Sequence, residues 1–290
     1  MLEVVSTLAQ WRGLTESLRA EGRSVGLTMT MGALHAGHTA LLERAARECD
    51  ASLASIFVNP LQFNDPSDLE RYPVDLEADL GVCERSGVRA VLAPPVAEVW
   101  PDWPAPTPTV VHVTGLTEVF EGAHRPGHFD GVAGVVAKVA IATGECRGYF
   151  GEKDFQQLSV VRQLVGDLGI PMTVVACETV READGLALSS RNVRLTDTGR
   201  AAALSLSRAL RAGRDAIERG DGVLAAHAAM ARVAAEEPEV ELAYAAAVEP
   251  ATLRVPASLA PGAVVRLLIA GTVEGIRLID NVEAVAGAAP

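Results

Sequence analysis

The stretch that decides the fold is a β-prone segment followed at once by a turn rich in small residues, Ser24-Val25-Gly26-Leu27-Thr28-Met29-Thr30 and then Met31-Gly32-Ala33-Leu34-His35-Ala36-Gly37-His38. The first segment is apolar, as expected of a buried strand. The segment 39–49 carries apolar residues at helical spacing, namely Leu41, Leu42, Ala45 and Ala46. His35 and His38 are therefore predicted to lie where a strand ends and a helix begins.

A turn of this kind suits a nucleotide triphosphate. Backbone N–H groups at a helix N-terminus point outward and favour phosphate, and small residues let a bulky ligand approach the backbone closely. Two histidines can then donate hydrogen bonds as charge builds on departing pyrophosphate. The turn indicates a nucleotidyl-transfer site, although the motif alone leaves open a metal-binding pair or two surface histidines.

Around this turn, strand-like and helix-like segments alternate. Helices are predicted near 7–21, 37–48, 68–86, 129–142 and 154–168, and strands at 24–30, 52–58, 88–93, 147–150 and 172–177. The Pro-rich stretch 94–108 is predicted to be a loop. This alternation is typical of an α/β fold with a mostly parallel sheet and helices on both faces. Ligands of such sheets bind beyond the carboxyl ends of the strands.

The composition changes after Asn192. Residues 196–237 hold two Ala- and Arg-rich helical segments, and alternating segments follow at 240–245, 264–270 and 275–279. We therefore expect a Rossmann-like domain over residues 1–185 and a smaller C-terminal α+β domain over residues 186–290, with a hinge near 183–195. The tail from Ala284 has only small side chains and is expected to be poorly ordered.

Bulk properties exclude several classes of protein. The formal charge of −12 over 290 residues argues against a nucleic-acid-binding or anionic-membrane surface. Neither a signal peptide nor an apolar run long enough to span a bilayer is evident. Because the four cysteines form no C-x-x-C pair, we expect reduced thiols in a cytoplasmic protein. The negative charge and the missing apolar span lead us to expect no nucleic-acid partner and no membrane.

Further polar motifs follow the later strands. Asn59 and Gln62 come at the end of the second strand, where amides suit a hydroxyl or carboxylate or else cap local backbone. Other motifs are Arg71-Tyr72-Pro73, Arg125-Pro126-Gly127-His128-Phe129-Asp130-Gly131, Phe150-Gly151-Glu152-Lys153-Asp154-Phe155-Gln156-Gln157, Arg181-Glu182-Ala183-Asp184-Gly185-Leu186-Ala187-Leu188-Ser189-Ser190-Arg191-Asn192 and Arg277-Leu278-Ile279-Asp280-Asn281.

In this order, the motifs resemble those of the pantothenate synthetase family, which belongs to the H-x-G-H nucleotidyltransferase superfamily. The resemblance covers nearly the whole chain. It implies a ligase that joins (R)-pantoate to β-alanine with ATP and Mg²⁺. Pantoate first attacks the α-phosphorus, giving pantoyl adenylate and pyrophosphate, and β-alanine then displaces AMP. The family is usually a homodimer.

The resemblance also implies roles for individual residues. The catalytic candidates are His35, His38, Lys153, Ser189, Ser190 and Arg191. The ATP-binding candidates are Met31, Gly32, Ala33, Leu34, His35, Ala36, Gly37, His38, Gly151, Glu152, Lys153, Asp154, Val180, Leu188, Ser189, Ser190 and Arg191. The candidates for pantoate and β-alanine are Gln62, Gln157, Asn59, Tyr72 and Arg125.

Structural roles remain open for several candidates. Asp79 is a magnesium candidate, but an exposed helical aspartate is the alternative. Lys153 could be a surface lysine paired with Asp154 or Glu152, and the two serines could merely cap a helix. The chain departs from the family pattern at Met29, where proline is usual, and at Ala36, where glutamate is common. We expect Ala36 to face away from phosphate.

Three other functions remain as alternatives. The first is a different small-acid adenylating or nucleotidyl-transfer enzyme of the same superfamily. The second is a nucleotide-binding regulator that has kept the fold. The third, a tRNA synthetase, is disfavoured because the acidic chain has no evident basic tRNA-binding domain.

Overall fold

The computed structural model describes residues 2–288, whose contacts divide them into two compact units. The first unit holds the residues up to Gly151 together with Gln156–Glu178. The second unit holds Glu152–Phe155 together with the residues from Thr179 onward. Each unit has its own sheet and its own buried core, so each is described by itself.

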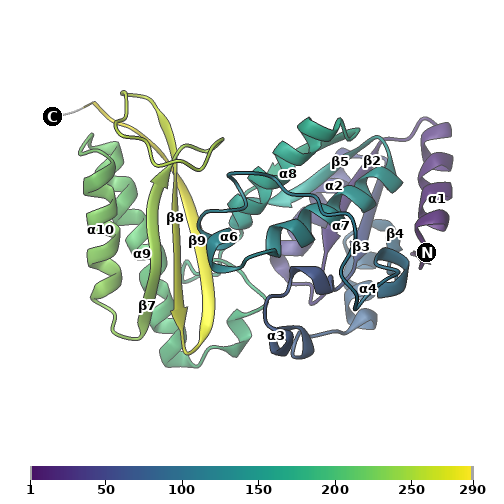
Figure 1. Cartoon of the computed structure of the whole chain (residues 1–290), viewed down its shortest axis with the longest axis horizontal. Coiled ribbons are helices and arrows are strands. Elements are labelled where there is room, and N and C mark those ends of the chain that lie inside the picture. Colours follow the sequence, from purple (N-terminus) through teal and green to yellow (C-terminus); the bar gives the residue numbers. More distant parts are fainter. Residues whose placement is uncertain (1, 289–290) are drawn as a thin grey trace. The chain divides into compact units, whose positions relative to one another are not determined.

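The first unit is built on a six-stranded sheet in the order β1-β4-β3-β2-β5-β6, and each neighbouring pair is parallel. Its strands are β1 (Glu3–Val5), β2 (Val25–Thr30), β3 (Ala51–Ile56), β4 (Val88–Leu92), β5 (Cys146–Gly151) and β6 (Met172–Cys177). Its main helices are α1 (Leu8–Ala20), α2 (Ala36–Glu48), α4 (Leu76–Arg85), α7 (His128–Thr143) and α8 (Phe155–Leu168). Helices flank the sheet, as Figure 1 shows. The predicted parallel α/β sheet is confirmed.

The order of the strands fixes where a ligand can bind. From β2 the chain crosses to β3 on one side, whereas from β5 it crosses to β6 on the other. Right-handed crossovers then place α2 and α8 on opposite faces. A topological switch point therefore lies between β2 and β5, at the carboxyl ends of the strands. The turn that carries His35 begins at that edge.

The single helix predicted over 68–86 is wrong. The chain forms a short helix, α3 (Pro66–Glu70), and then α4. Pro73 has no N–H and disfavours a helical residue before it, and Asp75 starts α4 afresh by accepting a hydrogen bond from the Ala78 N–H at 3.0 Å. The predicted loop at 94–108 likewise contains a short helix, α5 (Val96–Val99), and two further short elements are η1 (Pro60–Gln62) and α6 (Glu121–His124).

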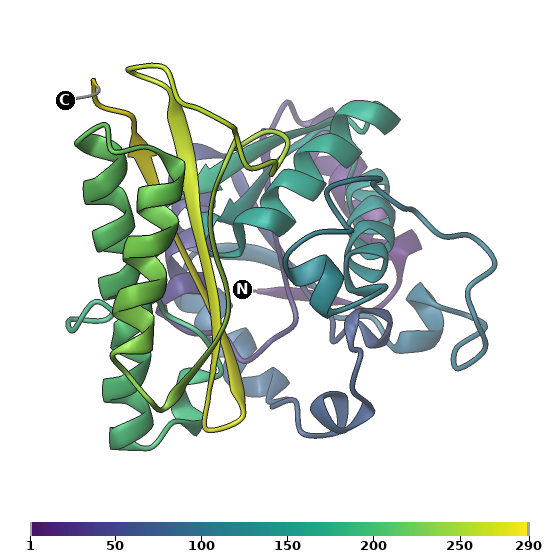
Figure 2. The same ribbon diagram turned by 60° about the vertical axis from the view of Figure 1, so that its left-hand side comes forward.

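The second unit packs two helices on a three-stranded antiparallel sheet, as predicted. The strands are β7 (Val240–Val248), β8 (Val264–Val273) and β9 (Ile276–Val285), and the helices are α9 (Asp197–Glu218) and α10 (Val223–Ala235). Short turns η2 (Glu152–Asp154) and η3 (Asn192–Arg194) complete it. Figures 1 and 2 both show α9 and α10 side by side on one face of this sheet.

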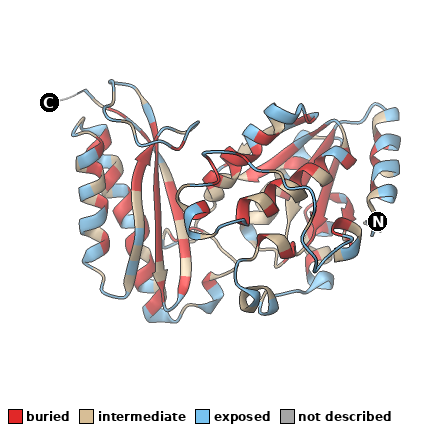
Figure 3. Cartoon of the chain, viewed as in Figure 1, coloured by how far each residue is buried: buried red, intermediate tan, exposed pale blue. Residues whose placement is uncertain are grey.

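The core of the second unit follows from helical spacing. In α9, Leu206, Leu210 and Ile217 are buried against the sheet. Gly213 is on the same face, where a Cβ would lie 2.6 Å from Cγ of Met230 in α10, so the glycine permits the close approach of the two helices. Figure 3 shows buried residues concentrated in the strands and on the inner sides of the helices.

At the ends of the chain, one strand was not predicted and one expectation is corrected, although residues 289 and 290 of the tail lie outside the described residues. β1 was not predicted, because three residues at a sheet edge carry too short a pattern. The tail from Ala284 was expected to be poorly ordered, yet β9 continues to Val285 and Ala286 is buried. Its backbone N–H donates to the carbonyl of Ala263 at 2.8 Å, so pairing with the core compensates for small side chains.

Within residues 2–288, no helix combines the length and the apolar character needed to cross a bilayer. The four cysteines are free thiols, and three of them, Cys83, Cys146 and Cys177, are buried. Burial raises the pKa of Cys83 to about 11 and that of Cys146 to about 12. These two thiols therefore stay protonated and pack as small apolar groups.

Candidate active site

The two histidines of the turn form a reciprocal cap at the start of α2. His35 is the N-cap residue, and its Nδ1 accepts a hydrogen bond from the Gly37 N–H at 3.1 Å. His38 lies one turn along, and its Nδ1 accepts from the His35 N–H at 3.3 Å. The ring centroids are 4.2 Å apart. This is a capping box in which imidazoles replace the usual hydroxyl and carboxylate.

The cap fixes the tautomer of both rings. A nitrogen that accepts a hydrogen bond cannot carry a proton, so each neutral ring must be protonated on Nε2. Each histidine can therefore present an Nε2–H donor. The sequence places both histidines at this turn, but only the geometry shows that the rings orient each other.

A buried carboxylate holds the turn before the histidines. Asp79 of α4 is 4% exposed, and its two oxygens accept from the N–H groups of Ala33 at 3.0 Å and Leu34 at 2.8 Å. Gly32 and Ala33 have positive φ values of 85° and 52°. A Cβ on Gly32 would lie 2.7 Å from Asp79 Oδ2, so only glycine fits there. The alternative of an exposed Asp79 is therefore wrong.

Four backbone N–H groups of the turn that were expected to bind phosphate already donate to side chains. The N–H groups of Ala33, Leu34, His35 and Gly37 are donated to side chains of the same unit. The expectation that backbone N–H groups point outward is thus not met for these four residues. Imidazole Nε2–H groups become the main candidate donors. Ala36 is exposed at the first position of α2.

We expect Asp79→Asn to lower the free energy of unfolding by about 1–3 kcal/mol, because the amide cannot accept both N–H groups and leaves a donor poorly paired. Urea unfolding measures the change. Glu77→Gln, on the exposed side of the same helix, removes a charge without touching the turn. Equal unfolding midpoints for the two variants would contradict the assigned role of Asp79.

The amides at the end of β3 differ in what they can reach. Asn59 is 1% exposed; its Nδ2 donates to Gln62 Oε1 at 3.0 Å and to the Gly131 carbonyl at 2.9 Å, and its Oδ1 accepts from Trp100 Nε1 at 2.8 Å. Both amide hydrogens are used, so Asn59 orients its neighbour. Gln62 Nε2 lies 2.7 Å from Met31 Sδ. Gln62 is also buried, at 7% exposed, and its contact with substrate stays a prediction.

Arg125 and His128 converge on the backbone of Gln62. Its carbonyl accepts from Arg125 Nη2 at 3.2 Å and from His128 Nδ1 at 2.7 Å, and His128 Nε2 lies 3.2 Å from Arg125 Nη1. His128 is buried and orders this loop. Tyr72 packs edge-on against Phe63, with ring centroids 5.5 Å apart. Arg125 and His128 therefore hold the backbone of Gln62, whereas Tyr72 contacts the neighbouring Phe63.

A histidine outside this cluster fastens the neighbouring loop to α7. His112 Nδ1 lies 2.8 Å from Asp130 Oδ1, and its Nε2 lies 3.3 Å from Glu118 Oε1. The hydrogen bond to Asp130, followed by that to Glu118, raises the pKa of His112 above its usual value. When it is protonated, the ring can donate to both carboxylates.

We expect this bridge to add stability that is fully present below the unfolded-state pKa of about 6.5 and is lost as pH rises through the raised folded-state pKa. The wild-type chain should therefore exceed His112→Gln in stability at about pH 5.5 and match it at about pH 8.5. Urea unfolding at both pH values measures this. A difference that persists unchanged at the higher pH would exclude the charge as its cause.

The two glutamines that begin α8 have separate roles. Gln156 is buried; its Oε1 accepts from the Glu121 N–H at 3.0 Å, and its Nε2 donates to the carbonyls of Leu116 and Val119 at 2.8 Å each. Gln156 therefore fixes the loop before α6. Gln157 lies half-buried beside it, which leaves the predicted contact with pantoate to Gln157.

Gly151 ends β5 in the first unit, and the remaining candidates lie in the second unit. Lys153 is in η2 with its side chain 20% exposed, and Nζ lies 3.3 Å from Asp154 Oδ1. The pairing foreseen as the structural alternative thus exists, but an ion pair this exposed adds little stability. Lys153 can exchange Asp154 for a phosphate at small cost.

The segment 180–192 forms a narrow loop. The backbones of Arg181 and Ala187 form an isolated antiparallel β-bridge, and the Leu188 N–H donates to the Val180 carbonyl at 3.0 Å. Ser189 Oγ accepts from the Arg191 N–H at 3.2 Å, which stabilises local backbone. The N-caps of the next two helices, η3 and α9, are Arg191 and Thr196, so the alternative that the serines cap the next helix is wrong. Arg200 Nη2 lies 2.7 Å from Glu182 and 2.6 Å from Asp184, which ties the loop to α9.

The structure thus brings the candidates together in two groups, one in each unit. In the first, the turn at Met31–His38 meets Gln62 through Met31. In the second, Lys153 and the loop carrying Ser189–Arg191 belong to the same compact unit. That the two groups share one substrate stays a prediction. Trp100 was missed because its contact with Asn59 spans 41 residues and leaves no local signal.

Comparison with known proteins identifies the family of the chain. A model of the pantoate-β-alanine ligase family matches residues 3–283. The chain belongs to this family. It is 49% identical over 282 residues to pantothenate synthetase of Cereibacter sphaeroides, covering 97% of this chain and 99% of the relative. The family resemblance inferred from the motifs is confirmed.

Solved structures of the family agree with the fold. The crystal structure of pantothenate synthetase from Thermus thermophilus is similar with a TM-score of 0.88 and 46% identity, covering 97% of this chain and 98% of that one. The pantoate-β-alanine ligase from Francisella tularensis, solved as a complex with β,γ-ATP and β-alanine, has a TM-score of 0.78 and 30% identity over 97% of each chain.

Proposed function

We propose that the chain condenses (R)-pantoate with β-alanine in an ATP-dependent reaction that yields pantothenate, AMP and pyrophosphate. The family match over residues 3–283 is the observation that carries this proposal. A carboxylate is a poor electrophile, so it is first activated: a pantoate oxygen attacks the α-phosphorus and the bond to pyrophosphate breaks. The β-alanine nitrogen then attacks the acyl carbon, AMP leaves, and the amine gives up a proton.

The residues required are donors and cations rather than a nucleophile. We assign the Nε2–H groups of His35 and His38 to the ATP phosphates, where charge grows in the transition state. Lys153 supplies a point charge at the α-phosphate, and Ser189, Ser190 and Arg191 receive departing pyrophosphate. Gln62 and Gln157 hold pantoate. Catalysis then rests on positioning and on stabilising charge.

Magnesium remains part of the proposal as an ion that accompanies ATP. Among residues 2–288, no three His, Cys, Asp or Glu side chains are grouped to hold a metal ion, and both oxygens of Asp79 already accept hydrogen bonds. Mg²⁺ usually binds substrate phosphates with few protein ligands. The residues therefore fit no protein-only magnesium site, and we assign no step to the ion.

Two further properties are proposed from the family resemblance. We infer a homodimer, which light scattering at several protein concentrations tests; a constant monomer mass would overturn it. We also infer a cytoplasmic location, since the free thiols suit a reducing compartment. Cell fractionation tests this, and recovery outside the cytoplasm would overturn it.

One coupled assay tests the reaction itself. Pyrophosphate and AMP are measured with ATP, Mg²⁺ and pantoate, with and without β-alanine. We expect pantoate-dependent pyrophosphate formation, and steady AMP release only when β-alanine is added. Replacing pantoate by other small acids tests for a different adenylating enzyme of the superfamily. ATP binding without pyrophosphate release under any of these conditions would indicate a nucleotide-binding regulator instead.

A further inference from the structure

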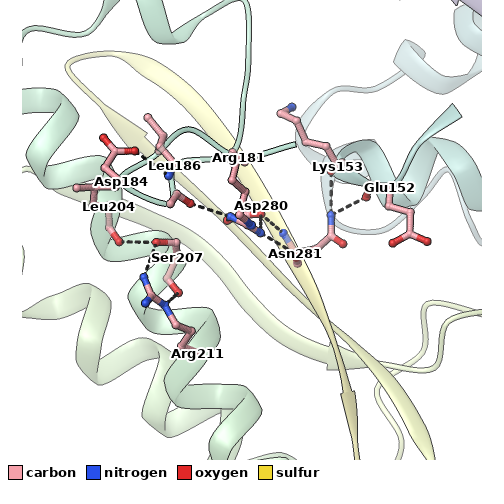
Figure 4. A network of polar contacts seen from close by, with 12 residues as sticks. Glu152, Lys153, Arg181, Asp184, Leu186, Leu204, Ser207, Arg211, Asp280 and Asn281 are labelled. Atoms are coloured by element: carbon pink, nitrogen blue, oxygen red, sulfur yellow. Dashed lines mark hydrogen bonds and ion pairs between the residues drawn. The ribbon is translucent and has the colours of Figure 1, made fainter. Parts of the chain in front are cut away.

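The motif Arg277–Asn281 carries the resemblance in the C-terminal hairpin but has no role in the reaction described so far. Its last residue, Asn281 of β9, is 4% exposed and reaches the turn that carries Lys153. The side-chain Nδ2 donates to the carbonyl of Glu152 and to the carbonyl of Lys153, each at 2.9 Å. Figure 4 shows the amide between these two carbonyls, while the lysine side chain extends away from it.

The orientation of this amide is itself fixed. Asn281 Oδ1 accepts from Arg266 Nη1 at 3.2 Å, so the oxygen faces a cation and the NH₂ group must face the carbonyls. The backbone N–H of Asn281 donates to Asp280 Oδ1 at 2.7 Å. Asp280 in turn holds the guanidinium of Arg181 through two hydrogen bonds of 2.7 and 2.8 Å. Asn281 therefore cannot rotate without breaking other buried contacts.

Arg266 contacts the side chains of the same turn. It is 6% exposed, and both terminal nitrogens lie 3.4 Å from Glu152 Oε2. Its guanidinium lies over the ring of Phe155, 4.2 Å from the centroid. Two side chains of the hairpin β8–β9 thus hold the turn Glu152–Phe155. Asn281 contacts its backbone, and Arg266 contacts the side chains of Glu152 and Phe155.

Holding the backbone matters because of the side chain that it carries. A lysine has four rotatable bonds, and only a fixed Cα gives its Nζ a defined reach. Displacement of a reacting group by about 1 Å can cost about 100-fold in rate. The contact made by Nζ within the second unit is the replaceable pair with Asp154. The backbone hydrogen bonds from Asn281 are therefore the firmer constraint on where Lys153 sits.

We propose that Asn281 is a positioning residue for the adenylation step, and that it acts by holding the backbone of Lys153 through its two amide hydrogens. The proposal rests on the role of Lys153 assigned above. The competing explanation is that Asn281 merely stabilises the hairpin. The two differ in whether the effect of Asn281 requires the lysine side chain.

The test combines Asn281→Asp with Lys153→Met in a double-mutant cycle. Aspartate has the same shape but no donors for the two carbonyls. We expect Asn281→Asp alone to lower kcat for pantoate-dependent pyrophosphate release about 10- to 100-fold, with the KM for pantoate within about twofold. In the Lys153→Met background, the same substitution should cost less than about twofold in single-turnover rate. Asn281→Gln, which retains the amide, should recover part of the loss.

Val273→Ala is the matched control. Val273 is buried at the end of β8, where it pairs with Ile276, whereas the contacts with Glu152–Phe155 are made by Arg266 and Asn281. Its truncation should lower the urea midpoint and leave kcat within about twofold. The proposal is overturned if Asn281→Asp keeps full kcat, if its loss is undiminished in the Lys153→Met background, or if Val273→Ala loses as much kcat. Should Asn281→Asp not fold, Asn281→Ala serves in the same cycle. Full activity of Lys153→Met would instead refute the role of Lys153.

Discussion

Replacing His38 by alanine is expected to slow pantoate-dependent pyrophosphate release about 10²- to 10³-fold, the usual cost of removing one preorganised donor from a developing charge. The variant should still fold, because the hydrogen bond from the His35 N–H that it loses is worth about 1 kcal/mol. Single-turnover release of pyrophosphate measures the effect. A near-wild-type rate would mean that the ring does not contact the reacting phosphates.

Two conservative variants separate the two nitrogens of His38. Asparagine places its Oδ1 near the position of Nδ1, so it can accept the His35 N–H but offers no donor at the place of Nε2. Glutamine reaches the place of Nε2 with an N–H but loses the cap. We therefore expect His38→Asn to be stable and slow, and His38→Gln to be less stable and faster. The opposite ranking would assign catalysis to the cap rather than to the donor.

Lys153→Met should lower the same rate about 10²- to 10³-fold, because a fixed cation near the α-phosphate stabilises charge that water cannot reach as it forms. Methionine keeps the length of the stem and removes the charge. Lys153→Arg should recover little, since a planar fork cannot replace a compact ammonium at one phosphate oxygen. Circular dichroism and the urea midpoint should match those of the wild type, because the side chain pairs only weakly with Asp154.

Arg162→Met provides the control for charge. Arg162 is exposed on α8, so this variant changes the net charge of the chain equally without altering the turn. It should retain its rate within about twofold, as surface substitutions away from special features do. If Lys153→Met and Arg162→Met were equally active, Lys153 would be the paired surface lysine that the sequence left as an alternative.

The fold was predictable where the hydrophobic period was long and regular. The alternation of strand-like and helix-like segments around β2 and α2 predicted the parallel sheet. The Ala- and Arg-rich composition of the segment that forms α9 predicted the second unit. The single helix predicted over 68–86 was wrong because the apolar spacing continues past Pro73, whereas a helical backbone cannot continue through a proline that has no N–H. β1 was missed because its stability comes from pairing with β4, which a three-residue pattern cannot reveal.

At the candidate site, the sequence identified the chemical groups and missed what holds them. His35, His38, Gln62 and Lys153 stand out by residue type and position after strands. Asp79 stood out only as a magnesium candidate, and its support of the turn was missed because its partners are turn residues 45 and 46 positions away. The contact of Trp100 with Asn59 and the contacts of Asn281 with Glu152 and Lys153 were missed for the same reason. Supporting contacts depend on tertiary neighbours, which the period of a sequence does not encode.

The short segment Glu152–Phe155 belongs by its contacts to the second unit, while the chain on both sides belongs to the first. A fragment cut after Glu178 would keep this segment but lose Asn281 and Arg266, leaving two carbonyls and a glutamate without their partners. The larger half is therefore expected to be a poor module for recombination or domain exchange. Because Glu152–Phe155 lies between two segments of the first unit, no single cut in the chain separates the two units with both complete. The two units are therefore expected to have been inherited together.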